Sequence, residues 1–158
     1  MKEILTTKGK VAIVDDADFA WLSQMKWYAK EGTRTFYAVT MVGRRHVPMH
    51  RLIMGSPKGK DIDHINGDGL DNRRSNLRVC SRSENLMNRG ASPKNTSGFK
   101  GVSWNEATGS WRAKIQRRGQ SIHIGLFQTK EAAAIAYNKT AEKLFKQFAK
   151  LNPITEQI

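Results

Sequence analysis

Residues 61–88 read DIDHINGDGLDNRRSNLRVCSRSENLMN, and this stretch decides the fold of the middle of the chain. Its first residues predict a short strand that ends at Asp63 and His64. Residues 66–69, Asn-Gly-Asp-Gly, tolerate a positive φ and predict a sharp loop. Residues 77–79 predict a return strand, so two short strands face one another across the loop.

A capping box follows the return strand. Ser81 is placed to be the N-cap and Glu84 occupies the third helical position, which predicts a helix over about residues 82–90. Asn85 and Asn88 then lie three residues apart on one helical face, where Asn85 can point back at the Asp63-His64 end of the first strand. The stretch as a whole predicts a strand, strand, helix unit.

The polar residues of this unit suit the hydrolysis of a phosphodiester. The carboxylate of Asp63 and the amide oxygen of Asn85 are hard ligands that suit Mg²⁺. The neighbouring His64 can take a proton from water near neutral pH. Because side chains alternate along a strand, Asp63 and His64 face apart unless the strand bends, so the interpretation needs the turn at Asn66. Asn76 would orient or brace the loop.

Two other interpretations of the acidic cluster are weaker. An Asp-His pair beside Asn-Gly can be a plain surface turn, but the added capping box favours a built site. An EF-hand loop counted from Asp61 would put Ile65 at a ligand position and Asn66 where a glycine is required, which excludes it. His46 and His123 have no acidic neighbour in sequence, so we treat both as non-catalytic.

These residues resemble the HNH nuclease family, in its homing-endonuclease branch with the ββα-metal fold. The resemblance rests on HRLIM at residues 50–54, DHINGDGLDNRRSNLR at 63–78 and SENLMN at 83–88. It implies a general base, one divalent metal ion (Mg²⁺, with Mn²⁺ able to substitute) held by two ligands, a residue that holds the loop, and supporting residues. The general base is then His64, and the two metal ligands are Asp63 and Asn85. Asn76 holds the loop, and the supporting residues are His50, Arg51 and Asn88.

Charge and composition limit the partners. Lys and Arg number 27 against 14 Asp and Glu, a net charge of +13, which favours a polyanionic partner such as nucleic acid. No apolar run approaches the length of a membrane-spanning helix and no signal-peptide pattern follows Met1, so we expect a soluble intracellular protein without a membrane partner. The single cysteine, Cys80, excludes an internal disulfide and a Cys-rich structural zinc site, and we expect it in the core.

The first 48 residues contain eight basic and five acidic residues (+3) and gather no catalytic residue types. Residues 11–14 predict a strand, and residues 17–24 a helix that starts after Asp15 and Asp16. Residues 35–42 and 45–48 predict a hairpin around Gly43 and Arg44. We expect these aromatic and apolar side chains to be buried by packing: Trp21, Leu22, Met25, Trp27 and Tyr28.

The last third holds eleven basic and four acidic residues (+7) and changes in pattern. After a polar linker, residues 91–97, three strand-like runs predict an antiparallel meander. In residues 110–117, apolar and basic side chains alternate, so one face is apolar and the other is free for DNA. Thr129 caps a predicted helix, residues 130–146, whose alanines can cover the apolar face. The three runs are residues 99–104, 110–117 and 121–127.

This part resembles the Apetala-2 or ethylene-response-factor DNA-binding domain. The resemblance rests on SGFKGVSWN, GSWRAKI, IGLFQTKEAAAIAYN and AKLN. Several arginines and tryptophans of that family are replaced, so its target sequence does not transfer. The positions that it implies for contact with bases and phosphates are Lys100, Ser103, Asn105, Arg112, Lys114, Gln116, Ser121 and His123.

The sequence therefore predicts an α+β protein, with a small ββα-metal nuclease module and a three-stranded antiparallel sheet packed on one helix. The predicted divisions are an extension (1–48), the nuclease module (49–90), the linker (91–97), the DNA-binding domain (98–153) and a tail (154–158). The predicted function is site-directed endonuclease activity of homing type on double-stranded DNA, in a phage or mobile-element protein. A non-enzymatic DNA-binding regulator and an RNA-directed nuclease are the alternatives. Nicking or double-strand cleavage, and monomer or homodimer, stay open.

Overall fold

The computed structural model describes residues 1–55 and 57–154 and divides into two compact units, residues 1–85 and 86–158. Its helices and small antiparallel sheets confirm the predicted α+β class. In the described residues no helix is both long enough and apolar enough to cross a bilayer. Most of the predicted tail, from residue 155 on, lies outside the described residues.

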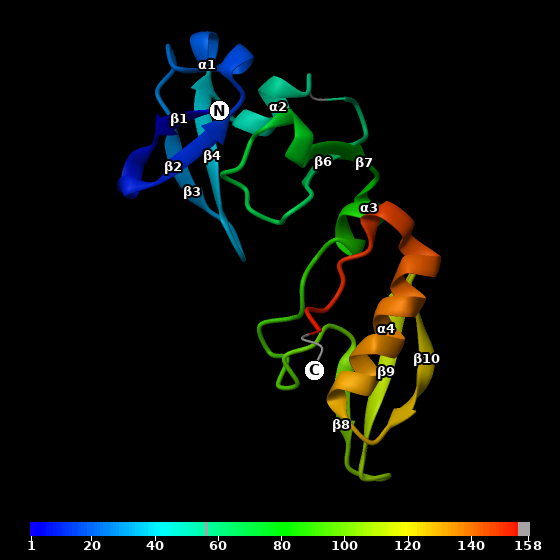
Figure 1. Ribbon diagram of the computed structural model, residues 1–158. Helices are drawn as coiled ribbons and strands as arrows, with labels where there is room; N and C mark the ends of the chain where they lie inside the picture. Colours follow the sequence, from blue (N-terminus) through cyan, green and yellow to red (C-terminus); the bar gives the residue numbers. More distant parts are fainter. Residues whose placement is uncertain (56, 155–158) are drawn as a thin grey trace. The chain divides into compact units, whose positions relative to one another are not determined.

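The first unit contains three small antiparallel sheets (Figure 1). They pair β1 with β2, β4 with both β3 and β5, and β6 with β7. The strands are β1 (Lys2–Leu5), β2 (Val11–Val14), β3 (Tyr28–Glu31), β4 (Phe36–Val42), β5 (Arg45–Pro48), β6 (Asp61–His64) and β7 (Leu77–Cys80). The helices are α1 (Asp16–Leu22), α2 (Met49–Ile53) and α3 (Arg82–Met87), with 3₁₀ turns at Thr7–Gly9 and Arg74–Asn76; the last two residues of α3 belong to the second unit.

One hydrophobic core joins the N-terminal strands to the strand, strand, helix stretch. It contains Ile4, Ala12, Val14, Leu22, Trp27, Ala38, Met49, Ile53, Ile62 and Leu77. Backbone hydrogen bonds also connect these parts. The Ile13 amide donates to the Leu70 carbonyl, and the Ile13 carbonyl accepts from the Asn72 amide, both at 2.8 Å. The sequence left open whether residues 1–48 fold separately, and the structure shows them as part of the core that carries the central stretch.

The N-terminal predictions met mixed outcomes. The strand at β2 and the hairpin between β4 and β5 are confirmed, with Val42 opposite Arg45 across the Gly43-Arg44 turn. Strands β1 and β3 were not predicted. The expectation that Trp21 and Tyr28 are buried is wrong: they are 39% and 43% exposed.

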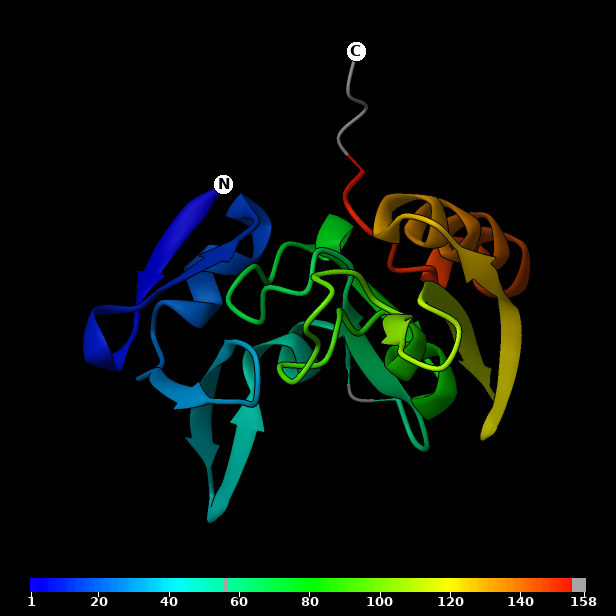
Figure 2. The ribbon, with the colours of Figure 1, turned by 90° about the horizontal axis from the view of Figure 1, so that it is seen from below.

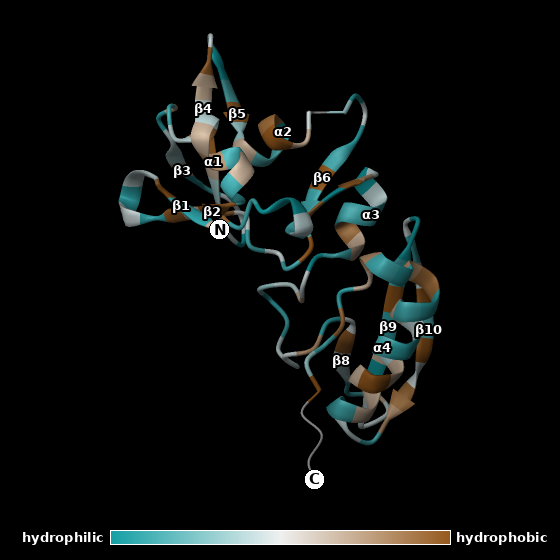
Figure 3. Cartoon of the chain, turned by 45° about the horizontal axis from the view of Figure 1, so that its top comes forward, coloured by the Kyte–Doolittle hydropathy of each residue, from teal (hydrophilic) through white to brown (hydrophobic). Residues whose placement is uncertain are grey.

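The second unit is an antiparallel sheet of order β10-β9-β8 with one helix across it, as predicted. Figure 2 shows α4 along one face of this sheet. The elements are β8 (Val102–Asn105), β9 (Ser110–Arg117), β10 (Gln120–Phe127) and α4 (Lys130–Phe145), with a 3₁₀ turn at Lys146–Phe148. Figure 3 shows hydrophilic residues on α4 and hydrophobic residues along β9 and β10.

Close packing explains why β8 begins three residues later than predicted. Gly101 has φ +76°, and a Cβ at this position would lie 2.3 Å from the ring of Tyr137 on α4 and 2.5 Å from the Lys114 carbonyl oxygen. Only glycine fits such a backbone position, so the extended strand can begin only after it. On the same face Ala113 and Ile115 are buried beneath α4, which confirms the predicted alternation.

Candidate active site

The two strands β6 and β7 set the positions of the predicted catalytic residues. Asp63 pairs with Arg78 and His64 with Leu77 in a ladder that is regular to its end. Asp63 and His64 therefore leave opposite sides of the ladder, and the predicted turn follows directly after them, with the Gly67 amide donating to the His64 carbonyl at 2.9 Å. Each of the two residues is only 6% exposed.

Asp63 is held by an arginine that sequence reasoning did not single out. Arg78 donates from Nη2 (2.7 Å) and Nε (2.9 Å) to Oδ2 of Asp63. The register of the two strands indicates this pair, because Arg78 on β7 lies directly opposite Asp63 on β6. Arg78 thus supplies the counter-charge of this buried carboxylate, which is the kind of group that a hard cation binds.

The His64 ring lies among polar and aromatic neighbours. Its Nε2 is 3.4 Å from Oδ1 of Asn72, and its centroid is 4.9 Å from His50 and 5.9 Å from Tyr37. Burial lowers the pKa of His64, although the bond with Asn72 and the charge of Asp63 act in the opposite direction. A lowered pKa leaves the imidazole neutral near pH 7, so that it can accept a proton.

His50 and Arg51 are consecutive residues on α2 and lie in different surroundings. His50 is buried edge-on against His64, and burial lowers its pKa to about 3. In the described part of the chain its Nδ1 has no hydrogen-bond partner. Arg51 instead donates to the Lys60 carbonyl at 3.4 Å, at the loop before β6. His50 is thus a neutral neighbour of His64 at neutral pH.

Asn76 braces the loop between the strands. Its Oδ1 accepts from the Asn66 amide at 3.0 Å, and its Nδ2 donates to Asn66 Oδ1 and to the Asp71 carbonyl. These bonds close the loop from both ends, at the position where the sequence predicted an orienting asparagine. A further ion pair from Arg74 to Asp18 at 2.8 Å anchors the loop to α1.

Helix α3 begins with the predicted capping box. The Ser81 amide and hydroxyl both donate to Oε2 of Glu84 at 2.7 Å, and the Glu84 amide donates to Oγ of Ser81 at 3.2 Å. One turn into the helix, Asn85 donates from Nδ2 to Oδ2 of Asp61 at 3.0 Å. The prediction that Asn85 points at the Asp63-His64 end of the strand is therefore wrong, because Asn85 contacts Asp61, the first residue of β6.

Asp61 connects Asn85 to the side of the ladder that carries Asp63. The two aspartates are two residues apart on one strand, so they share a face and lie about 7 Å apart along it. Sequence reasoning had not given Asp61 a role.

The predicted helical pairing of Asn85 with Asn88 is wrong, because α3 ends at Met87 and the buried Asn88 follows it.

Asp63 and Asn85 carry the donor types that a hard divalent ion prefers, and they lie at the two ends of β6. Asp63 offers a carboxylate and Asn85 an amide whose nitrogen is used by Asp61, which leaves its oxygen as the end that can be a ligand. Over the described ranges, no three His, Cys, Asp or Glu side chains gather into a metal cluster. Such a set suits Mg²⁺, which keeps several waters and takes other ligands from phosphate.

In the second unit, the polar residues implied for DNA contact share one face of the sheet. Cross-strand pairs place Ser103 beside Arg112, Lys114 beside His123, and Gln116 beside Ser121. Arg112 donates to Ser103 Oγ at 3.5 Å, and Asn105 continues this face along β8. Lys100 lies apart from them, before β8, where its Nζ donates to the Met87 carbonyl.

Known proteins match the stretch that carries this site. The HNH endonuclease family matches residues 45–87, which include β5, α2, the β6–β7 ladder and α3. The region holds each residue to which a catalytic or metal-binding role was given from the sequence, namely His64, Asn76, Asp63 and Asn85.

Two viral proteins are similar over longer spans. Protein 3.8 of Escherichia phage T7 is 35% identical over 108 residues, 68% of this chain and 88% of its own length. A protein of Acanthamoeba polyphaga mimivirus, described as an uncharacterized HNH endonuclease, is 33% identical over 150 residues, 93% of this chain and 77% of its own. The chain belongs to the HNH endonuclease family. No solved structure matches it.

Proposed function

We propose that this nuclease is a metal-dependent DNA endonuclease of homing type, in which His64 is the general base and Asp63 and Asn85 hold one divalent ion, Mg²⁺ or Mn²⁺. The observation that carries the proposal is the placement of Asp63 and His64 as the last two residues of β6, with Asn85 on the Asp61–Asp63 side of the strand. Because the two side chains leave opposite sides of β6, we place the phosphodiester at the strand end, where the chain turns and a substrate could lie against both.

Each residue has a role that follows from its surroundings. The neutral His64 accepts the proton of the attacking water, and Asn72 holds the ring in one orientation. Asn76 keeps the loop closed so that the strand end stays fixed. A bound divalent ion would stabilise the negative charge that develops on the phosphate and the leaving oxygen.

Arg78 has two possible effects on this chemistry. Its ion pair balances the charge of the buried Asp63 and holds the carboxylate in place, yet it also occupies the carboxylate that a cation would share. The second effect is the one observation that favours the rival function, a DNA-binding regulator that keeps the nuclease scaffold. Cleavage with added metal ions distinguishes the two.

We propose that the second unit provides the target selectivity, as an Apetala-2-like domain over residues 98–153, while residues 49–90 carry the chemistry. This proposal is supported by the polar face of the sheet of β8, β9 and β10, which lies opposite the face that α4 covers. A surface of this kind, bearing Arg112 and Lys114, can lie against the bases of a major groove. The viral origin of both relatives supports a phage or mobile-element protein.

The test is the conversion of supercoiled plasmid to nicked or linear DNA by the full chain. We expect conversion with Mg²⁺, none with a chelator, and a higher Mg²⁺ requirement for Asn85→Ala. A plasmid that stays supercoiled with Mg²⁺ and Mn²⁺ while it is shifted on a gel would support the regulator.

Selectivity has a separate test. On a plasmid with a mapped cleavage site, Arg112→Ala with Lys114→Ala is expected to spread cleavage over other sites. If this double variant cleaves at the same site as the wild type, the sheet face does not determine which DNA sequence is cleaved.

A further inference from the structure

We propose that the hairpin of β4 and β5, residues 36–48, is a second DNA-contact surface that enters the major groove beside the cleavage site; we name it the basic ribbon. The inference rests on the proposed DNA substrate but assigns a role to a part of the chain that carries none of the nuclease residues. Four observations support it.

The first observation is the separation of charge within the N-terminal third. Residues 1–25 contain three basic and four acidic residues (−1), whereas residues 26–48 contain five basic and one acidic (+4). The net positive charge of this third therefore comes from residues 26–48, the strands β3, β4 and β5 with their turns. A solvated scaffold has no reason to concentrate charge of one sign, while a phosphate-binding surface does.

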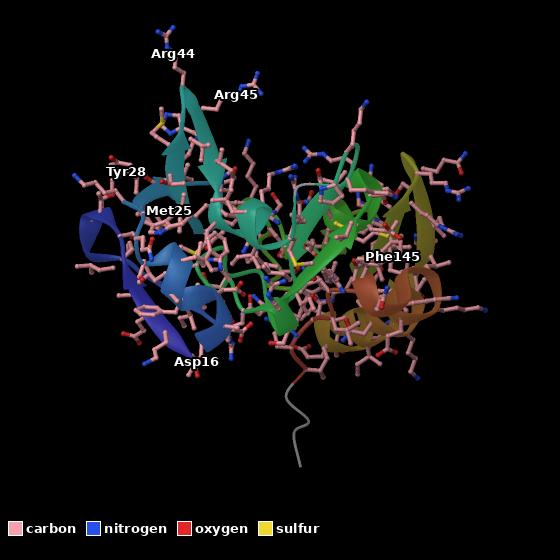
Figure 4. All side chains as sticks on the ribbon, turned by 90° about the horizontal axis from the view of Figure 1, so that it is seen from above. Asp16, Met25, Tyr28, Arg44, Arg45 and Phe145 are labelled. Carbon is pink, nitrogen blue, oxygen red and sulfur yellow. The ribbon has the colours of Figure 1, made fainter. Side chains whose placement is uncertain are left out.

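The second observation is the form of the hairpin. Arg44 and Arg45 sit at its tip and their side chains point away from the unit (Figure 4). Directly behind them Met41 and Val42 are 43% and 46% exposed. Basic groups in front of exposed apolar groups suit a groove, where arginines meet phosphates or guanine edges and apolar side chains meet thymine methyl groups. A two-stranded ribbon has the width that the major groove admits.

The third observation is the continuity of the ribbon with the catalytic site. Met41 pairs with His46, and side chains two residues apart share a face, so Tyr37, Met41 and His46 lie on one face of the ribbon. Tyr37 is the residue whose ring lies 5.9 Å from that of His64. Val39, between Met41 and Tyr37 on this face, is buried, so a duplex would contact the exposed tip while the inner part of the same strand packs beside the general base.

The spacing along β4 gives the inference a quantitative form. Six residues separate Tyr37 from Gly43 at the turn, about 20 Å of strand. At about 3.4 Å per base pair this length corresponds to about six base pairs. The ribbon tip is then expected to contact phosphates about six base pairs from the cleaved bond.

The fourth observation disfavours a second copy of the chain as the occupant. β5 is an edge strand of its sheet, and an unprotected edge can pair with an edge of another molecule. Pro48, Arg45 and His46 line this edge, and both proline and charge oppose such pairing. Charge complementarity thus favours a polyanion, and the proposed substrate is one.

The experiment measures binding in the presence of chelator, so that cleavage plays no part. The affinity of the full chain for a labelled 40-base-pair duplex is measured by fluorescence anisotropy at several salt concentrations. We expect the slope of log affinity against log salt to become shallower by about 1.8 in Arg44→Gln with Arg45→Gln, about 0.9 for each lost phosphate contact. The control is Lys2→Gln with Lys8→Gln, which removes two charges from residues 1–25 and should leave the slope unchanged.

The outcomes separate this inference from the proposed function. A double variant that melts like wild type and keeps the wild-type slope overturns the ribbon, even if the protein cleaves DNA normally. A shallower slope in both double variants also overturns it, because the loss would then reflect net charge alone. A shallower slope in the arginine variant only supports the ribbon, whether or not the wild type cleaves DNA.

A mapped cleavage site allows a positional check. Phosphate ethylation interference with the wild type should show sensitive phosphates about six base pairs from the cleaved bond that the arginine variant lacks. Identical interference patterns for the two proteins would contradict the inference.

Discussion

The imidazoles of His50 and His64 meet edge to face inside the first unit, with centroids 4.9 Å apart. Neither ring can take up a proton without placing a charge in a buried site, and two charged rings would repel each other. Burial lowers the pKa of both histidines, that of His50 to about 3. The packing that keeps the proposed base neutral should therefore make the fold sensitive to acid.

His50→Phe should reduce this acid sensitivity. In the unfolded chain the pKa of a histidine is about 6.5, so between about pH 6.5 and 3 the unfolded state binds a proton that folded His50 does not. Stability contributed by neutral His50 is thus present above about pH 6.5 and lost as the pH falls. Removing the imidazole should make the fall in the free energy of unfolding shallower by about 1.4 kcal/mol per pH unit, as measured by urea denaturation between about pH 6 and 4.5.

The control for this prediction is His46→Phe, at an exposed position of β5. It should leave the pH dependence unchanged. Equal slopes in wild type and His50→Phe would show that the buried ring is not the source of the acid sensitivity.

The pair of Asp63 and Arg78 allows a second prediction at this scale. Arg78→Met leaves a buried carboxylate without its counter-charge, which should lower the free energy of unfolding by about 3 to 5 kcal/mol. Arg82→Met removes an exposed partner of Asp61 and should cost less than about 1 kcal/mol. Similar losses in the two variants, measured by chemical denaturation, would mean that the Asp63 carboxylate does not depend on Arg78.

Among the elements, α3 connects local sequence to the site most directly. Its first turn is fixed by reciprocal bonds between Ser81 and Glu84, and its second turn carries Asn85. The capping box was predictable because it depends on residues three positions apart. The contact of Asn85 with Asp61 was not, since it depends on where the helix meets a strand 24 residues earlier.

Ser81→Ala should therefore act on metal use through helix stability. Loss of the cap costs about 1 kcal/mol at the start of α3 and allows its first turn to fray. We expect the Mg²⁺ concentration for half-maximal plasmid cleavage to rise several-fold with little change in the rate at saturation. Ser83→Ala, an exposed change in the same helix, should not alter it. Equal Mg²⁺ requirements for the two variants would show that the Ser81 cap does not affect the use of the metal ion.

The strands that the sequence missed share a physical cause. β1 and β3 are each four residues long and largely exposed, so they lack the alternation of apolar residues that marks a half-buried strand. β9 was predictable because its eight residues alternate over an apolar face. Short strands form here because a neighbour supplies the pairing, which no local pattern records.

At the scale of the whole molecule, the shared core of the first unit is the feature that sequence reasoning could not reach. The polar residues of the candidate site were readable, because their spacing in residues 61–88 is local. The support from Ile4, Val14 and Leu22 could not be predicted, since these residues precede Ile62 by 40 to 58 residues. Arg78 became apparent from the register of β6 and β7, and Asn72 from its contact with His64.

A chain that lacks residues 1–48 tests this dependence. The deletion removes six of the buried core residues, from Ile4 to Ala38, so residues 49–85 should lose their fold while residues 86–158 keep theirs. Amide NMR spectra would show dispersed signals for the second unit only. Dispersed signals from the β6–β7 ladder in the shortened chain would mean that the central stretch folds without its N-terminal support.

The most direct test of the central claim is the single-turnover rate of plasmid nicking by His64→Ala at saturating protein and Mg²⁺, alongside wild type. Removal of a general base should lower this rate by about 10² to 10⁴-fold while DNA binding and the melting temperature stay near those of wild type. A variant that nicks within a few-fold of the wild-type rate would contradict the assignment of His64 as the base.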